Sequence, residues 1–384
     1  MRFFSTLIVV LGLTIPAHGA LRSPEALFGE VERCGYMSHC PSFVELMKWR
    51  ALIAPMLIEK LASSRYSGRF FAERGLKQLG VDAVPHLIQA LSTTNVSLRR
   101  RIMSLLADVG NSRAFVPLAK MLDRVSSYDR RYVIEALGKL GDRRAIPILL
   151  EMLKSTYWRD QSTAVRAFIR LPHKAAVPLL LKLLPNRRLK SAVIEALGAS
   201  GSKEAIAPLI ELLKNQSSMR YYYWQLGTIA EALGRLGAKD AEPLLLKLLA
   251  NRSSTVQART ALALGMLKSR KALPQLKKMQ TQSYFRTRIA ATVAIILIGK
   301  HPEGTKALQK MVSDYSSSTR SLAIQMIGFL KDKKSVKLLI DRLSIERYSY
   351  VRGHLTLALR EITGRNFGES IEQWTQWAKR HEMY

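Results

Sequence analysis

The segment YVIEALGKLG at residues 132–141 decides the fold, because it returns along the chain at a nearly constant interval. It recurs as AVIEALGASG at 192–201 and as TIAEALGRLG at 228–237. A glycine, or a residue in its place, closes each copy: Gly80, Gly110, Gly141, Pro172, Gly201, Gly237, Lys268, Gly299, Lys331 and Gly364. The intervals between these closing residues run from 29 to 36 residues. A period of this length is typical of a stacked supersecondary repeat.

Each repeat is predicted to be a pair of helices. In residues 133–140 the apolar side chains fall three and four positions apart, which gives one buried stripe on a helix. The same spacing returns in the segment that follows, AIPILLEMLK at 145–154. The closing glycine suits the left-handed position that ends a helix. Because β-branched residues do not alternate with a period of two, we expect no strands.

This pattern resembles the HEAT repeat family, in particular its short bacterial repeats of the phycobilisome lyase type, over roughly residues 69–364. The resemblance implies an all-α fold, an α-solenoid of about ten helical hairpins with a cap at each end. We assign the solenoid to residues 62–364 and a C-terminal cap to 365–384. There Trp374 and Trp377 would cover the last apolar face of an open stack.

The first nineteen residues have the pattern of a secretory signal peptide. Arg2 precedes an apolar stretch from Phe3 to Ile15, and Ala17 and Gly19 are the small residues of a cleavage site before Ala20. A buried first helix and a retained membrane anchor are the alternatives. We therefore predict an extracytoplasmic protein, periplasmic or secreted, without a transmembrane span after cleavage, since no later run reaches about 20 apolar residues.

Residues 20–61 are predicted to hold a cysteine pair and an opening cap helix that covers residues 42–61. Cys34 and Cys40 are the only cysteines of the chain, and export implies an oxidising compartment in which nearby thiols pair. The interpretation we favour is a Cys34–Cys40 disulfide. The alternatives are a metal site that adds His39 and two unpaired thiols.

The composition indicates the kind of partner. Lys and Arg number 60 against 29 Asp and Glu, so the formal net charge is +31. Such a charge attracts anionic partners. For an exported protein the candidates are an acidic protein surface, anionic lipid head groups or an anionic glycan, and nucleic acid is the poorer candidate. The apolar fraction of 48% argues against disorder, and two cysteines argue against a disulfide scaffold.

One cationic position recurs eleven residues before the closing residue, early in the second helix of the repeat. It holds the basic ladder: Arg69, Arg99, Arg130, Lys190, Arg288 and Arg320, with Arg352 one residue out of register. In the HEAT pattern an Asp a few residues earlier commonly pairs with this Arg, and most turns here lack it, with Asp129 as the exception. The ladder is either structural, bound to backbone carbonyls, or a binding groove along the concave face.

Aromatic residues lie beside the ladder. The densest group is Arg220, Tyr221, Tyr222, Tyr223 and Trp224, inside the longest interval. Others lie near the same turns: Tyr128, Tyr157, Trp158, Tyr284, Phe285, Tyr315, Tyr348 and Tyr350. Tyr, Trp and Arg are enriched at binding hot spots, which makes these residues partner-binding candidates. The alternative for residues 220–224 is a longer helix that buries some of the rings.

No catalytic motif, metal-ligand spacing or cofactor fingerprint stands out in the sequence, so we predict no catalytic residues, no metal and no cofactor. Glu135, Glu195 and Glu231 recur at one repeat position, where a solvated helix face explains them. The sequence therefore favours an exported, non-enzymatic scaffold or adaptor that binds an acidic protein. The alternatives are an envelope protein that binds anionic lipid or glycan, and an enzyme like the phycobilisome lyases or the HEAT-like DNA glycosylases.

Overall fold

The computed structural model describes residues 22–34, 40–217, 223–281, 284–299 and 302–383. All regular secondary structure in these ranges is helical, which confirms the all-α prediction. The described residues form two compact units, one that ends at Ala145 and one that begins at Ile146. The predicted signal peptide, residues 1–19, lies outside the described residues and stays a prediction.

The N-terminal unit opens with two helices that a disulfide joins. Cys34 ends α2 (Pro24–Arg33), Cys40 precedes α3 (Pro41–Leu46), and their sulfurs are bonded, with the two Cα atoms 6.0 Å apart. The predicted disulfide is therefore formed, and neither thiol is available for the metal site considered above. Because α2 also packs on α5 (Tyr66–Leu79), the disulfide fastens the opening helices to the first repeat.

Residues 42–61 do not form the single cap helix expected from the sequence. They contain most of α3, a 3₁₀ segment (Met47–Ile53) and α4 (Ala54–Lys60). Arg50 interrupts the helical path, because its backbone adopts φ 51° and ψ −136°.

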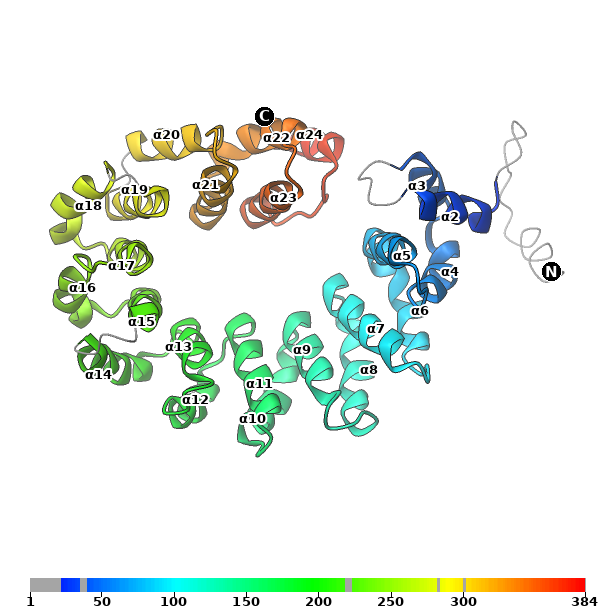
Figure 1. Cartoon of the computed structure of the whole chain (residues 1–384), viewed down its shortest axis with the longest axis horizontal. Helices are drawn as coiled ribbons and strands as arrows, with labels where there is room; N and C mark the ends of the chain where they lie inside the picture. The colour runs from blue at the N-terminus through cyan, green and yellow to red at the C-terminus, as the bar shows by residue number, and fades with distance from the viewer. Residues whose placement is uncertain (1–21, 35–39, 218–222, 282–283, 300–301, 384) are drawn as a thin grey trace. The chain divides into compact units, whose positions relative to one another are not determined.

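The repeats form ten helix pairs in the described residues, as the sequence predicted. We call the first helices of the pairs row A and the second helices row B (Figure 1). Row A consists of α4, α6 (Val84–Ala90), α8 (Phe115–Lys120), α10 (Ile146–Lys154), α12 (Val177–Leu183), α14 (Ile206–Ser217), α16 (Glu242–Leu248), α18 (Leu273–Met279), α20 (Pro302–Met311) and α22 (Val336–Ile345). Row B consists of α5, α7 (Val96–Val109), α9 (Arg130–Leu140), α11 (Trp158–Arg170), α13 (Lys190–Ala199), α15 (Tyr223–Arg235), α17 (Ser254–Met266), α19 (Phe285–Gly299), α21 (Ser317–Leu330) and α23 (Ser349–Thr363).

A short 3₁₀ turn with a fully buried small residue leads into most row A helices. The buried residue ends the turn: Ala83, Ala114, Ala145, Ala176, Ala205, Ala241, Ala272 or Ser335. Pro178, Pro243 and Pro274 follow in the first turn of α12, α16 and α18, where a missing N–H costs little. The small side chain lets this turn lie against the core, and the proline sets the backbone angle for the helix.

Left-handed residues end most row B helices, as predicted. Positive φ values occur at the closing residues Gly80, Gly110, Gly141, Gly201, Gly237 and Gly364, and also at Lys268 and Lys331, which replace glycine. The two remaining closing positions, Pro172 and Gly299, behave differently. Leu171 follows α11 with φ −118°, just before Pro172, and α19 continues as a helix through Gly299.

Neighbouring row B helices pack closely because a glycine of one faces an alanine of the next. A Cβ atom at Gly234 would lie 2.6 Å from Cα of Ala263, and one at Gly265 would lie 2.6 Å from Cα of Ala294. Gly198 meets Ala232 in the same way, at 2.7 Å. Real Cβ atoms do not approach so closely, so the glycine of the repeated EALG segment allows the close approach of the helices.

The row B helices of each unit run in the same direction. In the C-terminal unit, Ser321 contacts His354 near the starts of α21 and α23, and Gly328 faces Ala358 near their ends. In the N-terminal unit, Arg100 binds Asp129 near the starts of α7 and α9, and Lys139 binds Asp108 near their ends. The starts of the row B helices therefore lie along one edge of each unit.

The C-terminal cap is α24 (Ile371–Arg380), which lies against α22. Trp374 is fully buried, packs edge-on against Phe367 with ring centroids 4.9 Å apart, and donates its indole N–H to the carbonyl of Gly368. Trp377 stacks on His381. The two tryptophans thus cover the end of the stack, as expected.

Helix α19 is the most continuously buried row B helix, with every residue from Ile289 to Ile295 inside the core. No helix in the described part of the chain combines the length and the apolar character that a membrane crossing requires.

Candidate protein-binding edge

The basic ladder lies where the row B helices begin, and part of it binds backbone. Arg69 donates from Nη1 to the carbonyls of Ser63 and Ser64, both at 2.7 Å. Arg99 donates in the same way to Thr93 at 3.0 Å, and Arg352 reaches the carbonyl of Glu346 at 3.4 Å. In each case the guanidinium stabilises the turn that lies five or six residues before the arginine. This geometry is the structural role that the sequence analysis kept as an alternative.

Arg320 is the most buried residue of the ladder, and it has an acidic partner. It donates to the carbonyls of Asp314 and Tyr315, both at 3.0 Å, and its guanidinium forms a two-pronged ion pair with Glu346, both contacts at 2.8 Å. The side chains of Arg320 and Glu346 are 6% and 1% exposed. The acid that pairs with this ladder arginine thus comes from the next repeat, 26 residues later, and not from an Asp in the turn before it.

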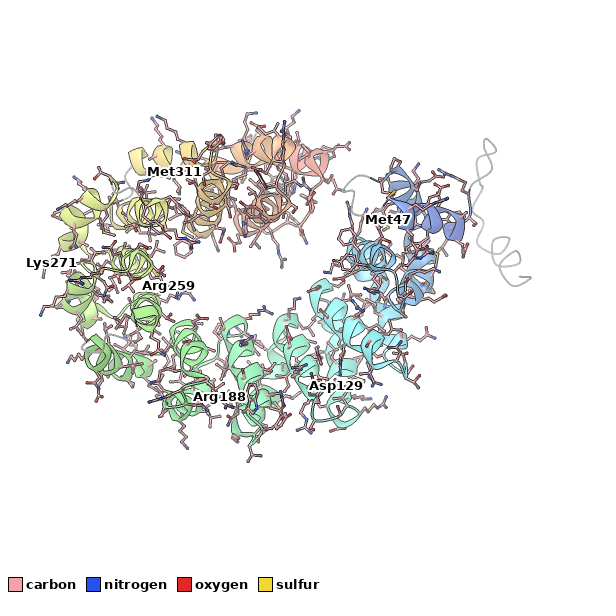
Figure 2. The ribbon with its side chains drawn as sticks, in the orientation of Figure 1. Met47, Asp129, Arg188, Arg259, Lys271 and Met311 are labelled. Atoms are coloured by element: carbon pink, nitrogen blue, oxygen red, sulfur yellow. A yellow bond between two sulfur atoms is a disulfide. The ribbon has the colours of Figure 1, made fainter. Side chains whose placement is uncertain are left out.

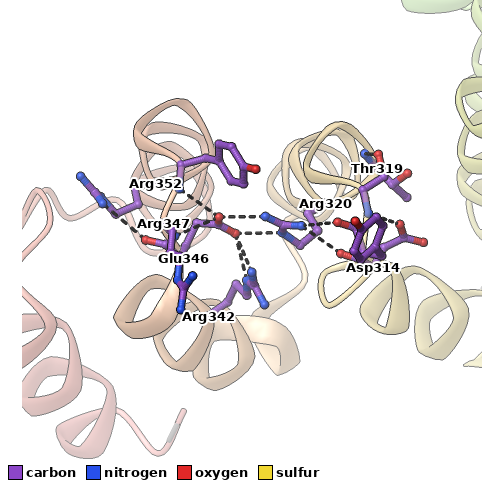
Figure 3. A network of polar contacts seen from close by, with 10 residues as sticks. Asp314, Thr319, Arg320, Arg342, Glu346, Arg347 and Arg352 are labelled. Atoms are coloured by element: carbon purple, nitrogen blue, oxygen red, sulfur yellow. Dashed lines mark hydrogen bonds and ion pairs between the residues drawn. The ribbon is translucent and has the colours of Figure 1, made fainter.

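Glu346 organises this network (Figure 3). It also accepts hydrogen bonds from Arg342, at 3.0 and 2.8 Å, and from the backbone N–H groups of Arg347 and Tyr348. Burial alone would raise the pKa of Glu346, but the hydrogen bonds from Arg320, Arg342 and the Tyr348 backbone outweigh it and lower the pKa to about 2. The sequence analysis missed Glu346. The one local feature that could have identified Glu346 is its position two residues before Tyr348. Tyr348 is the N-cap of α23, and its own side chain accepts no hydrogen bond from the helix.

Asp129, singled out as the acid of the Arg130 turn, binds a neighbour instead. It accepts a hydrogen bond from Nε of Arg100, one helix earlier, at 2.8 Å, and another from the hydroxyl of Ser126. Arg130, Lys190 and Arg288 are half-buried at the ladder position. For Lys190 and Arg288, the described residues offer no ion-pair partner.

Exposed aromatic rings accompany the ladder along this edge of each unit. Each of the following lies within about a turn of a row B helix start and is at least 42% exposed: Tyr66, Tyr128, Trp158, Tyr284, Tyr315, Tyr348 and Tyr350. Tyr157 and Phe285 lie at the same starts but are half-buried. The predicted association of aromatic residues with these turns is therefore present in three dimensions.

Arginines stack on these rings. Arg131 lies over Tyr128 and Tyr132, 4.3 and 4.7 Å from the ring centroids, and donates to both hydroxyls at 2.8 Å. Arg159 and Arg188, the latter labelled in Figure 2, lie 5.0 and 5.9 Å from Trp158. A guanidinium held over an aromatic face is ordered before any partner arrives, which lowers the entropy cost of binding.

We call this surface the arginine–aromatic edge. In each of the two units it consists of the turns that lead into the row B helices of that unit and the first turn of each helix, with the ladder residues and the exposed rings given above. Residues 220–222 lie outside the described residues, as do the side chains of Tyr223 and Trp224, so the role proposed for this group stays a prediction.

Family-model comparison matches HEAT repeats to four segments, at residues 84–167, 149–221, 226–296 and 286–360. Together these segments cover more than half of the chain. The chain belongs to the HEAT repeat family. No curated protein matches the sequence.

The solved structures that are similar to this chain share little sequence identity with it. Human deoxyhypusine hydroxylase in complex with glycerol is 21% identical, with 66% of this chain and 98% of that chain covered and a TM-score of 0.30. An engineered protein is 18% identical, with 88% and 98% covered and a TM-score of 0.37. The complex of CpcE and CpcF of phycocyanin lyase from Nostoc sp. is 20% identical, with 76% and 92% covered and a TM-score of 0.35.

Within the HEAT repeats, the carboxylates that the sequence analysis noted do not form a uniform row. Glu135 is exposed, whereas Glu231 is half-buried and binds Arg235 of its own helix and Arg259 of the next row B helix. Figure 2 shows Arg259 on row B, while Lys271 marks the turn before row A helix α18. Across the described residues, no three His, Cys, Asp or Glu side chains are placed to hold a metal ion.

Proposed function

We propose that this HEAT-repeat protein is an exported, non-enzymatic scaffold that binds an acidic partner protein along the arginine–aromatic edge. The observation that carries the proposal is the recurrence of exposed aromatic rings at the starts of six row B helices, α5, α9, α11, α19, α21 and α23. At four of these helices an arginine lies over the exposed ring, which is Tyr66, Tyr128, Trp158 or Tyr348. Exposed apolar rings cost free energy in water when they serve no contact, and Tyr, Trp and Arg dominate protein-binding hot spots.

The charge balance of the edge supports an acidic partner. Its carboxylates are already engaged: Asp129 by Arg100, Asp314 by the Ser316 backbone N–H, and Glu346 by two arginines. Several exposed arginines in the same turns have no ion pair to a described residue: Arg187, Arg188, Arg286 and Arg347. A partner that supplies carboxylates would form ion pairs with these arginines, because Arg binds carboxylate in a two-pronged geometry.

Export is supported by two observations. The N-terminal sequence has the pattern of a signal peptide, and the Cys34–Cys40 disulfide suits an oxidising compartment.

Site-specific photo-crosslinking in the native host tests the proposal. A photoreactive residue at Tyr284 or Tyr315 on the edge is compared with one at Val116 on row A helix α8, all three being exposed. We expect one extracytoplasmic protein to be crosslinked from the edge positions and not from Val116. Capture of the same protein should fall in Trp158→Ser/Arg188→Gln and persist in Lys203→Gln/Lys239→Gln, which changes exposed lysines before row A helices.

Two results would overturn the proposal. The first is a crosslinked protein whose capture is equal in the edge variant and the lysine control. The second is crosslinking to lipid or glycan alone from the edge positions, which would favour the envelope-binding alternative. Arg320 is left unchanged in these variants, because its burial ties it to stability.

A further inference from the structure

A cavity of about 400 Å³ opens in the C-terminal unit where helices α19, α20 and α21 meet (Figure 1). Ile296 of α19, Thr305 and Leu308 of α20, and Leu330 at the end of α21 line it, together with the turn of residues 331–334. The exposed rings of the arginine–aromatic edge lie where row B helices begin, whereas this cavity lies where α21 ends. The two features are therefore separate.

The connection between α19 and α20 explains why a cavity forms here. Only residues 300 and 301 separate these helices, whereas a 3₁₀ turn with a buried small residue lengthens most other connections of this kind. Helix α20 begins tight against α19, because a Cβ atom on Gly304 would lie 2.7 Å from Cγ1 of Ile296. Helix α21 packs less closely against α19 than α17 does. Space is thus left beside Thr305 and Leu308, between α20 and the end of α21.

The lining of the cavity is divided into an apolar wall and a cationic rim. The wall comes from the three helices: Leu308 is fully buried, and Ile296 and Leu330 are half-buried. The rim is the turn with the sequence Lys-Asp-Lys-Lys, residues 331–334, whose three lysines are exposed. None of these lysines forms an ion pair with a side chain in the described part of the chain. A ligand in this cavity therefore meets apolar surface on one side and positive charge on the other.

The acid of the rim, Asp332, is engaged by the protein itself. Its carboxylate accepts hydrogen bonds from the hydroxyl of Ser335 at 2.6 Å and from the side-chain amide of Gln309 at 3.3 Å. It also accepts one from the backbone N–H of Lys334 at 3.2 Å, which caps the 3₁₀ turn before α22. Because these donors hold the carboxylate, the lysines of the rim stay open to an external anion.

We propose that this cavity binds one anionic amphiphile, a molecule with a carboxylate or phosphate head group on an alkyl chain. The head group contacts the lysines of residues 331–334, and the chain packs on Ile296, Leu308 and Leu330. A small polar anion would leave the apolar wall in water, and a neutral apolar molecule would leave the lysines without a counter-charge. The volume falls in the range of small-ligand pockets, which suits a single chain. The site goes beyond the proposed function, because none of its residues belongs to the arginine–aromatic edge.

Lys331 allows a variant in which binding and stability should change in opposite directions. Its backbone is left-handed, with φ 50°, at a repeat position that glycine usually occupies. Glycine adopts this conformation without strain, so Lys331→Gly should raise the melting temperature while it removes a cation from the rim. Lys268, with φ 56°, has the same backbone conformation but does not line the cavity. Lys268→Gly is therefore the matched control, which should gain stability and keep its ligand affinity.

Calorimetric titration of the purified chain with decanoate tests the site, beside decyl phosphate, decanol and inorganic phosphate. We expect one saturable site for decanoate and at least about tenfold weaker binding of decanol and of inorganic phosphate. Octanoate should bind at least about fivefold more weakly than decanoate, because two fewer methylene groups are buried. The tighter ligand of the pair decanoate and decyl phosphate assigns the head group, as that of a fatty acid or that of a phosphate-bearing lipid.

Two changes of the rim should each weaken decanoate binding by at least about fivefold. They are Lys331→Gly and the double variant Lys333→Gln/Lys334→Gln. Lys277→Gln/Lys278→Gln, which alters two consecutive exposed lysines of α18, is the charge-matched control and should bind as the wild type does. A higher melting temperature of Lys331→Gly excludes loss of the fold as the cause of its weaker binding.

Three results would overturn the proposal. The first is the absence of a saturable site at millimolar decanoate. The second is equal binding of decanoate and either decanol or inorganic phosphate. The third is an equal loss of affinity in the rim variants and in Lys277→Gln/Lys278→Gln, which would indicate diffuse attraction to a cationic protein. Photo-crosslinking from Tyr284 should be the same in Lys331→Gly and the wild type, so this test is independent of the proposed function.

Discussion

At the scale of single residues, Arg320 and Glu346 form the most buried ion pair among the described residues. The arginine joins the turn before α21 to the turn before α23, because it binds carbonyls of one and the carboxylate of the other. The ladder position thus stabilises contacts between repeats here, whereas in Arg69 and Arg99 it stabilises a turn within one repeat.

Replacing Glu346 by Gln should lower the free energy of unfolding by about 3 kcal/mol, because it leaves the Arg320 guanidinium buried without its counter-charge. Urea unfolding followed by circular dichroism measures this loss. Glu372→Gln, which alters an exposed carboxylate of α24, should stay within about 0.5 kcal/mol of the wild type. Equal stability of Glu346→Gln and the wild type would contradict a stabilising role for the network.

The same pair predicts a pH dependence. Glu346 has a pKa of about 2 in the folded chain against an ordinary value of 4.5, so it binds protons more weakly when folded. Its stabilisation is present in full above pH 4.5 and is lost as the pH falls through about 2. The difference in unfolding free energy between wild type and Glu346→Gln should be constant near neutral pH and shrink below about 4.5. A difference independent of pH down to 2 would refute this assignment.

At the scale of the helix, the close approach of row B helices depends on glycine. Gly234→Ala should destabilise the fold by about 1–3 kcal/mol, because the added Cβ would lie 2.6 Å from the Ala263 backbone and push α15 from α17. Gly353→Ala is the matched control, since a Cβ on that helical glycine meets nothing within 4 Å. It should stabilise the chain by about 0.5–1 kcal/mol through helix propensity. Thermal unfolding of both variants checks the opposite signs.

At the scale of the whole molecule, each of the two units is a stack in which a repeat contacts mainly its neighbours, and both cysteines lie beside the opening helices of the first unit. Reduction of the Cys34–Cys40 disulfide should therefore loosen α2 and α3 and leave most of the helical circular dichroism signal intact. Hydrogen exchange located by mass spectrometry should rise near the cysteines and stay unchanged in α12–α23. Collapse of the helical signal on reduction would show that the stack depends on its N-terminal end.

Mass spectrometry also tests at which residue the mature chain begins. Protein purified from the native host should begin near Ala20 and carry no free thiol, since the predicted signal peptide is removed on export and the cysteines then oxidise. Intact Met1 on the mature protein would refute cleavage.

The sequence by itself determined the repeat, its two helices and their ends. Apolar residues three and four positions apart record which helix face is buried, and each closing glycine permits a left-handed backbone, so both features can be recognised within about 30 residues. The sequence also placed Tyr128, Trp158 and Tyr348 beside the ladder, because the positions of these residues within the repeat are local facts.

The tertiary structure decided which charges meet. Arg320 finds Glu346 26 residues away and Arg100 finds Asp129 29 residues away, in both cases across the junction of two repeats. Such pairs depend on the register and rotation of adjacent helices, which a local pattern does not encode. The same geometry leaves Arg101 and Glu135 facing one cavity while Lys139 is held by Asp108. Whether a charged side chain is paired within the protein thus depends on the helix packed beside it.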